Sequence, residues 1–376
     1  MINSLYIHIP FCVKMCIYCD FFSVPYDKAL ATDYITAVLK ELELRRNGAG
    51  VLKTVYIGGG TPTTIPALAL IRLLNTIKGA FGIAPDAELT IEANPGTVTG
   101  GMLRALFESG INRLSIGVQS FNDNDLKLLG RIHDFSEALD SIAAARDAGI
   151  INLSIDLIYG IPGQTLQAWT QTVSTAIEIS PEHVSAYELT PEKDTPLHKL
   201  ISTGKLEKPD EDTIIRMYSL AIDRFGKAGY SQYEISNFAK PGFQCIHNLN
   251  YWNRGQYLGI GAGAHGFIGD RRTKNTGNIR TYIELLSKGD LPEAEVLEIS
   301  CEDAIKESIF LGLKKTEGLD IREFREDLGI DLLEISDRLI HEGLLASDGV
   351  HLSLTRKGIV VSNRVITEMF TLLELD

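Results

Sequence analysis

The sequence predicts an α/β protein with a partial (β/α)6 TIM-like barrel and a smaller helical domain at its C-terminal end. Short runs rich in β-branched and aromatic residues alternate with amphipathic helical patterns over the first two hundred residues. After about residue 300 the pattern changes to helices followed by one hairpin. Strands and helices in alternation form right-handed βαβ units and hence a parallel sheet. Six such units favour an open, partial barrel over a flavodoxin-like sheet.

Six strands are expected, several of them nearly apolar, as strands covered on both faces are. They cover residues 5–9, 53–57, 88–93, 112–118, 152–158 and 183–189. The clearest helical patterns between them cover residues 32–46, 66–81, 136–149 and 166–179. We therefore assign residues 1–240 to the partial barrel.

Residues 241–299 are expected to connect the barrel to the last domain. This segment contains "HNLNYW" at 247–252 and a GxGxxG-like run at 261–266. The glycine run lacks the βαβ setting and downstream acid of a dinucleotide site, so we expect a tight loop packed against the barrel.

Residues 300–376 are expected to form a winged-helix-like domain. Amphipathic helices, each closed by a glycine, precede a hairpin about Asp348 and Gly349. Winged helices often bind DNA, but residues 301–376 carry 9 Lys and Arg against 16 Asp and Glu. This acidic balance opposes DNA binding. We expect the domain to cover the barrel mouth or to dock a protein partner.

The composition limits the compartment and the partners. A formal net charge of −13 argues against a nucleic-acid partner, because backbone binding needs Lys and Arg. The sequence shows no secretory signal pattern and no apolar run of roughly 18 residues, so we expect a cytoplasmic protein without a membrane span. Peripheral membrane association and a homodimer stay open. Three of the five cysteines lie within eight positions, which in a reducing compartment favours metal or redox chemistry.

Glycines and residues with hydroxyl, carboxylate or amide side chains lie at or just after the ends of the predicted strands. They are Gly58 to Thr61, Glu92, Gln119, Asp156 and Glu188. Each alone could be an ordinary turn or cap residue. Sites on parallel sheets collect at the carboxyl ends of the strands, so five such positions predict one shared mouth.

The three clustered cysteines, Cys12, Cys16 and Cys19, follow the first strand with the spacing CxxxCxxC. A structural zinc ion wants four ligands, and His8 is the one nearby fourth candidate. A redox dithiol needs only one CxxC pair, so it would not explain Cys12. A four-iron cubane held by three thiolates leaves one iron open for a small molecule, so the spacing on a barrel rim favours a [4Fe-4S] cluster.

CxxxCxxC with Tyr18 before the last cysteine, followed by a strand that ends in GGGTP, resembles the radical S-adenosylmethionine (SAM) superfamily over roughly residues 4–240. The resemblance implies that the methionine part of the cofactor chelates the open iron. An electron from the cluster then cleaves the sulfonium to give a 5′-deoxyadenosyl radical. The protein's task is to hold the cofactor while the cofactor does the chemistry.

The same resemblance implies S-adenosylmethionine contacts for Tyr6, Tyr18, Gly59, Gly60, Thr61, Glu92, Gln119, Arg131 and Asp156. Glycines without a Cβ let the backbone approach the methionine ammonium and carboxylate, and Arg131 supplies a fixed positive charge. For Tyr6 the alternative is a strand aromatic in the core.

Further segments, "YIHIPFC", "EANPGTV", "RLSIGVQSF", "IDLIYGIPGQT" and "YEISNFAKPG", resemble the oxygen-independent coproporphyrinogen III oxidase group. That group carries an N-terminal extension and a further cysteine just after the cluster, whereas Cys19 is followed here by Asp20 and Phe21. "CDFFS" and "HNLNYW" are instead similar to the HemW subgroup of haem chaperones. The resemblance implies haem binding and transfer to acceptor haemoproteins, with radical decarboxylation of coproporphyrinogen III as the alternative. Whether the chain is an enzyme stays open.

His247 is the candidate haem contact in "HNLNYW". Its ring nitrogen could coordinate haem iron, and Tyr251 and Trp252 offer flat faces to a porphyrin. Cys245 and His265 are further candidate ligands. The alternative is a loop histidine that is hydrogen-bonded to the backbone beside two core aromatics.

Overall fold

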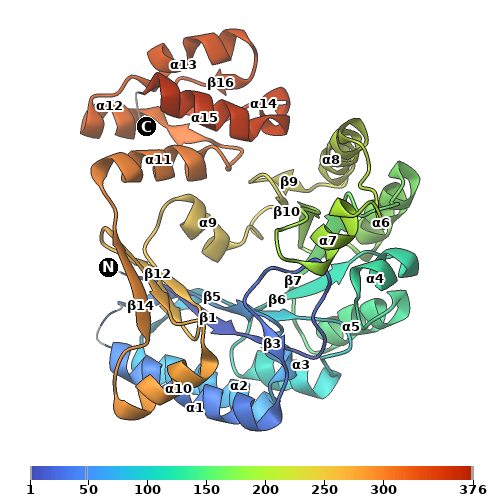
Figure 1. Ribbon diagram of the computed structural model, residues 1–376, viewed down its shortest axis with the longest axis vertical. Helices are drawn as coiled ribbons and strands as arrows, with labels where there is room; N and C mark the ends of the chain where they lie inside the picture. The colour runs from blue at the N-terminus through green and yellow to red at the C-terminus, as the bar shows by residue number, and fades with distance from the viewer. Residues whose placement is uncertain (1, 47, 49, 374–376) are drawn as a thin grey trace.

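The computed structural model describes residues 2–46, 48 and 50–373, and a nine-stranded sheet forms its centre (Figure 1). Six parallel strands lie in chain order: β1 (Ser4–Ile9), β4 (Leu52–Gly59), β5 (Ile83–Ala93), β6 (Arg113–Gln119), β7 (Asn152–Tyr159) and β8 (His183–Glu188). All six predicted strands are present. Within the described residues the sheet does not close, and the predicted partial barrel is confirmed as the fold class.

Three short strands extend this sheet at its edges. β11 (Leu258–Ile260) pairs parallel with β1. β10 (Asn237–Ala239) pairs antiparallel with β8, and β9 (Ser231–Gln232) pairs with β10. None of these three short strands was among the predicted ones.

Helices follow the strands along the chain. They are α1 (Lys28–Arg45), α2 (Ala67–Ala80), α3 (Gly100–Glu108), α4 (Asp123–Leu129), α5 (Phe135–Asp147), α6 (Leu166–Ile179), α7 (Pro196–Ser202) and α8 (Glu211–Lys227). Of these, α1, α2, α3, α5, α6 and α8 contribute to the core on the apolar outer face of the sheet, whereas α4 and α7 pack in a separate small cluster. Local sequence sets their starts. Asp134 and Glu137 form a capping box at α5, and the Thr165 hydroxyl accepts from the N–H of Ala168 at α6. Figure 1 shows α1, α2, α3 and α5 on the side of the sheet away from the C-terminal domain.

The two faces of the strands differ sharply in chemistry. Leu5, Ile7 and Ile9 of β1 belong to the core beneath the helices, whereas Tyr6 and His8 point to the other face. Polar residues continue on this inner face in the neighbouring strands: Thr54, Tyr56, Glu88, Glu92, Arg113, Ser115, Ser154, Asp156, His183 and Ser185. Side chains alternate between the two faces with a period of two. The inner face is covered as expected, but the expectation that it is apolar is wrong.

The segment 241–299 is structured. α9 (Ile246–Trp252) contacts β4, and β12 (His265–Ile268), β13 (Arg271–Asn275) and β14 (Glu293–Glu298) form an antiparallel sheet. α10 (Ile279–Lys288) packs against α1. The alternative of a loop histidine is wrong, because "HNLNYW" lies in α9. The glycine run 261–266 is the expected loop up to Ala264, and β12 begins at His265.

The C-terminal part has its own hydrophobic core, which includes Ile309, Leu339, Leu352 and Met369. Its elements are α11 (Cys301–Gly312), β15 (Leu319–Asp320), α12 (Ile321–Leu328), α13 (Leu332–His341), β16 (Leu345–Ser347), β17 (His351–Leu354), α14 (Arg356–Val360) and α15 (Ser362–Leu372). This order of helices and hairpin is that of the predicted winged helix.

The first of its helices ends earlier than expected. α11 stops at Gly312, and Gly318 lies in the following turn with a positive φ of 90°. The domain boundaries at 240 and 300 stay a prediction. Among the described residues no helix is long and apolar enough to cross a membrane.

Candidate cofactor site

A short loop after β1 carries the three clustered cysteines. β2 (Phe11–Cys12) and β3 (Val24–Pro25) pair in parallel and close the loop at its base. The N–H of Val24 donates to the Pro10 carbonyl at 2.7 Å, and that of Tyr26 donates to the Cys12 carbonyl at 2.9 Å. These bonds fix the thiols at the carboxyl end of the sheet.

A cavity of about 350 Å³ lies beside this loop. Its lining includes these residues that the sequence predicted: Cys12, Cys16, Tyr18, Cys19, Gly59, Gly60, Thr61, Glu92, Gln119, Arg131, Asp156 and Glu188. The carboxyl ends of five strands thus meet at one mouth, as expected for a parallel sheet. All lining residues fall between Cys12 and Glu192. The expectation that the C-terminal domain covers this mouth is therefore wrong, and its alternative, docking of a protein partner, stays a prediction.

Three thiols, those of Cys12, Cys16 and Cys19, line one cavity. Among the described residues no three His, Cys, Asp or Glu side chains could hold one metal ion. A cubane spreads its thiolates over separate irons, which fits three thiols facing one cavity. Burial raises the pKa of Cys12, and it raises the pKa of Cys19 to about 11. Both thiols therefore have to lose a proton when they bind iron.

Arg131 supplies the positive charge beside the thiols. Its Nη1 lies 3.4 Å from the Cys16 Sγ, and its Nη2 donates to Asn94 Oδ1 at 2.5 Å and to the Gly117 carbonyl at 2.6 Å. Asn94 in turn donates to the Thr61 hydroxyl at 2.7 Å. This network ties the cysteine loop to the ends of β4, β5 and β6. Asn94 is not among the predicted site residues, although it directly follows "EA" at the end of a predicted strand.

Gly60 gives the loop room to pack against the end of β4. A Cβ there would lie 2.9 Å from the Phe11 carbonyl oxygen and 3.0 Å from the Cys12 Sγ. We expect Gly60→Ala to lower the free energy of unfolding by about 1–3 kcal/mol and to reduce iron incorporation. Iron analysis and denaturant unfolding measure both effects. Gly101→Ala, where a Cβ meets nothing within 4 Å, is the matched control, and equal behaviour of the two variants would contradict the packing argument.

Two carboxylates line the cavity from the inner face of the sheet. Glu92 accepts from the Tyr56 hydroxyl at 2.7 Å and from the N–H of Gly59 at 3.1 Å. Burial raises the pKa of Glu92 to about 7. Asp156 accepts from the Ser115 hydroxyl at 3.1 Å, and burial also raises its pKa. A cationic or hydroxylated ligand would restore favourable partners to both groups.

Binding of S-adenosylmethionine should therefore depend on pH through Glu92. Below about pH 7 its carboxylate takes up a proton and loses the charge that attracts a cationic ligand. We expect the affinity to fall about tenfold from pH 8 to pH 6 in the wild type. Calorimetric titration at both pH values measures the slope, which should flatten in Glu92→Gln. The exposed Asp33→Asn serves as control, and a wild-type slope in Glu92→Gln would refute the assignment.

Tyr6 lies one layer below the cavity and does not line it. Its hydroxyl is 2.9 Å from His8 Nδ1, while His8 Nε2 is 2.8 Å from the Phe22 carbonyl. The Tyr6 ring stacks on Tyr56 at 6.3 Å. In this structure Tyr6 supports the loop through His8, and its contact with the cofactor stays a prediction.

His247 lies on α9, fully buried against the inner face. Its Nδ1 is 2.8 Å from the Thr54 hydroxyl, and its Nε2 is 2.8 Å from the Tyr251 hydroxyl. Its ring stacks on Tyr56 at 5.1 Å. Burial, with Arg113 nearby, lowers the pKa of His247 to about 3. Both ring nitrogens thus have partners in this arrangement, and haem contact by His247 stays a prediction.

The other two candidate haem ligands lie apart. Cys245 is buried, and its Sγ lies 3.4 Å from a Glu88 oxygen; burial raises its pKa to about 12. His265 is exposed on β12. Neither lines the cavity beside the cysteine loop.

Comparison with known proteins identifies the class first. The family model of the Radical SAM superfamily matches residues 6–176, and that of the HemN C-terminal domain matches residues 299–361. The three-cysteine loop on a partial barrel is the site that defines the first of these classes. Membership implies a [4Fe-4S] cluster and S-adenosylmethionine, which when bound supply one-electron chemistry.

Similar curated proteins place the chain in one family within this superfamily. The chain is 38% identical to "Heme chaperone HemW" of Bacillus subtilis over 96% of this chain and 98% of that protein. It is 36% identical to the Lactococcus lactis protein of the same name over 100% of this chain and 98% of that protein, and 42% identical to the Escherichia coli one over 70% of each. The chain belongs to the HemW family of radical SAM proteins.

The structure of coproporphyrinogen III oxidase (HemN) from Escherichia coli has the same fold. It superposes with a TM-score of 0.85 over 97% of this chain and 89% of that chain. The sequences are 23% identical, so this likeness concerns the fold alone.

Proposed function

We propose that the chain is a haem chaperone that binds haem and passes it to acceptor haemoproteins. The carrying observation is that proteins named heme chaperone are 34–38% identical to it over 96% of its length or more. The residues after Cys19 support this proposal. Asp20 and Phe21 stand where the resembling oxidases carry a further cysteine.

Within this proposal the barrel residues hold the two resident cofactors. Cys12, Cys16 and Cys19 bind the cluster, and Arg131 balances the negative charge of the thiolates. Glu92 and Asp156 orient the nucleotide from the inner face of the sheet. The three thiols must stay reduced for this task, which favours the cytoplasm as the compartment.

The second candidate function is oxidative decarboxylation of coproporphyrinogen III. The shared fold with the Escherichia coli oxidase favours it, although a common fold supports several functions. The two candidates differ in the fate of the porphyrin: a chaperone returns haem unchanged, whereas the oxidase converts its substrate.

One experiment separates the two functions. The anaerobically reconstituted protein is titrated with haem, and in parallel it is incubated with coproporphyrinogen III, dithionite and S-adenosylmethionine. A saturable Soret band and transfer of haem to an apo-haemoprotein, without protoporphyrinogen, are expected. Formation of protoporphyrinogen, or failure to bind haem, would overturn the chaperone assignment.

A further inference from the structure

A chain of hydrogen bonds joins two of the three clustered thiols through Asn94. The Cys12 Sγ lies 3.6 Å from the Thr61 hydroxyl oxygen, and the same oxygen accepts from Asn94 Nδ2 at 2.7 Å. On the other side Asn94 Oδ1 accepts from Arg131 Nη2 at 2.5 Å, and Arg131 Nη1 lies 3.4 Å from the Cys16 Sγ. Asn94 therefore bonds, through its two amide atoms, to one partner of each thiol.

The direction of each bond in this chain follows from Arg131. A guanidinium only donates, so the Asn94 atom that faces it must be the oxygen, and the amide nitrogen must face Thr61. The hydrogen of the Thr61 hydroxyl cannot point at an amide N–H group. It is therefore available to Cys12, whose deprotonated sulfur can only accept. Through its partners Asn94 thus directs one O–H and one N–H toward the two sulfurs.

The backbone around Asn94 holds its side chain in this position. The N–H and the hydroxyl of Thr97 both donate to the Asn94 carbonyl, at 3.0 and 2.7 Å. Gly117 lies against the amide, because a Cβ there would be 2.8 Å from Asn94 Oδ1. The Gly117 carbonyl also accepts from Arg131 Nη2 at 2.6 Å, which leaves Nη1 turned toward Cys16. The fold itself therefore fixes the orientation of the amide.

We propose that Asn94 is a positioning residue that sets the reduction potential of the [4Fe-4S] cluster. Hydrogen bonds to the sulfurs favour the more negative, reduced state of a cluster and so raise its potential. Asn94 lines the cavity beside the cysteine loop, but it acts on the sulfurs through Thr61 and Arg131. The inference rests on the proposed ligation of the cluster by Cys12 and Cys16, and it does not depend on haem.

Two residues at the end of β5 would then serve the two cofactors separately. Glu92 and Asn94 lie two positions apart, and both line the cavity. Glu92 bonds to Tyr56 and Gly59, whereas Asn94 bonds to the partners of the thiols. A change at Asn94 should therefore alter the potential of the cluster and leave the pH dependence of nucleotide binding unchanged.

Redox titration of the reconstituted full-length protein with dithionite, followed by electron paramagnetic resonance of the reduced cluster, tests this role. Asn94→Ala removes the bridge between Thr61 and Arg131. We expect the ratio of reduced to oxidised cluster at a fixed potential to fall about tenfold, which corresponds to about 59 mV for a one-electron couple. Asn94→Asp keeps the acceptor for Arg131 but takes the Thr61 hydrogen and adds a negative charge, so its potential should be lower still.

Thr61→Val tests whether the effect passes through the hydroxyl. This variant already lacks the O–H that faces Cys12, so part of the chain is broken before Asn94 is changed. Asn94→Ala should therefore shift the potential less in the Thr61→Val protein than in the wild type.

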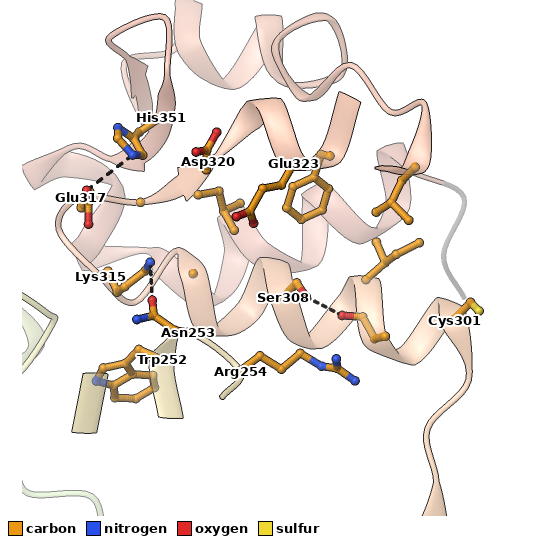
Figure 2. A pocket seen from close by; sticks show the side chains of 17 residues that line it. Trp252, Asn253, Arg254, Cys301, Ser308, Lys315, Glu317, Asp320, Glu323 and His351 are labelled. Atoms are coloured by element: carbon orange, nitrogen blue, oxygen red, sulfur yellow. Dashed lines mark hydrogen bonds and ion pairs between the residues drawn. The ribbon is translucent and has the colours of Figure 1, made fainter. Parts of the chain in front are cut away.

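Asn253 offers a matched control, because it is also an asparagine that holds a cation. Its Oδ1 accepts from Lys315 Nζ at 2.8 Å (Figure 2). It borders a second cavity, of about 560 Å³, between the end of α9 and the C-terminal domain. Among the described residues, none lines both this cavity and the one beside the cysteine loop. Asn253→Ala and Asn253→Asp should therefore keep the wild-type potential.

Wild-type potentials in both Asn94 variants would overturn the role of Asn94, and so would equal shifts in the Asn94 and Asn253 variants. Full additivity of Asn94→Ala with Thr61→Val would overturn it as well. Failure of Asn94→Asp to load iron would make Asn94 a purely structural residue and would also refute the proposal. A wild type that holds no iron would instead overturn the ligation by three cysteines on which the proposal rests.

Discussion

Replacing Cys16 by alanine is expected to lower the iron content from about four atoms per chain to near zero. The loop offers three thiols to the cavity, and a cubane left with two thiolates exposes a second iron to solvent and breaks down. S-adenosylmethionine binding should disappear with the cluster, because the open iron is then absent. Iron and sulfide analysis after anaerobic reconstitution, together with calorimetry, measures both losses.

Cys301→Ala is the matched control for this prediction. Cys301 is exposed at the start of α11, far along the chain from the cluster loop, so its loss should leave iron content unchanged. A Cys16→Ala protein that still holds four irons would refute the three-thiolate site.

The six central strands could be predicted because each carries its own periodic pattern of β-branched and aromatic residues. The edge strand β11 could not, because three residues become a strand only through pairing with β1, about 250 positions away in sequence. The polar inner face was visible in "LYIHI", where Tyr6 and His8 alternate with the core residues. The sequence does not show, however, that α9 packs against this polar face in place of an apolar layer.

The candidate site could be predicted where the motif itself fixes the position. Cysteine spacing and strand ends place Cys12 to Cys19 and the groups from Gly59 to Asp156 at one mouth. The environment of His247 could not be read in the same way. Its burial against Thr54 and Tyr56 depends on where α9 docks, and no local pattern encodes that contact.

Glu88 is the residue on which the docking of α9 depends. Its carboxylate accepts from the N–H groups of Ile246 and His247, at 2.9 and 3.1 Å, and is buried on the inner face of β5. Cys245, the residue before the helix, provides no side-chain cap. Burial acts to lower the pKa of the neighbouring Arg113, but Cys245 and then Glu88, with nearby tyrosines, outweigh it and hold that pKa above its ordinary value.

Glu88→Ala is therefore expected to lower the free energy of unfolding by about 3–5 kcal/mol, since the N–H groups of Ile246 and His247 lose their charged acceptor and the buried Arg113 loses a nearby negative charge. Glu88→Gln keeps an acceptor oxygen but not the charge, so its cost should be smaller, about 1–3 kcal/mol. Denaturant unfolding of the cluster-free protein measures both, with the exposed Glu43→Ala as the matched control. If Glu88→Ala unfolds like Glu43→Ala, α9 is held by other contacts. If instead the free energy of unfolding rises in the order Glu88→Ala, Glu88→Gln, wild type, one carboxylate fixes the helix that carries His247.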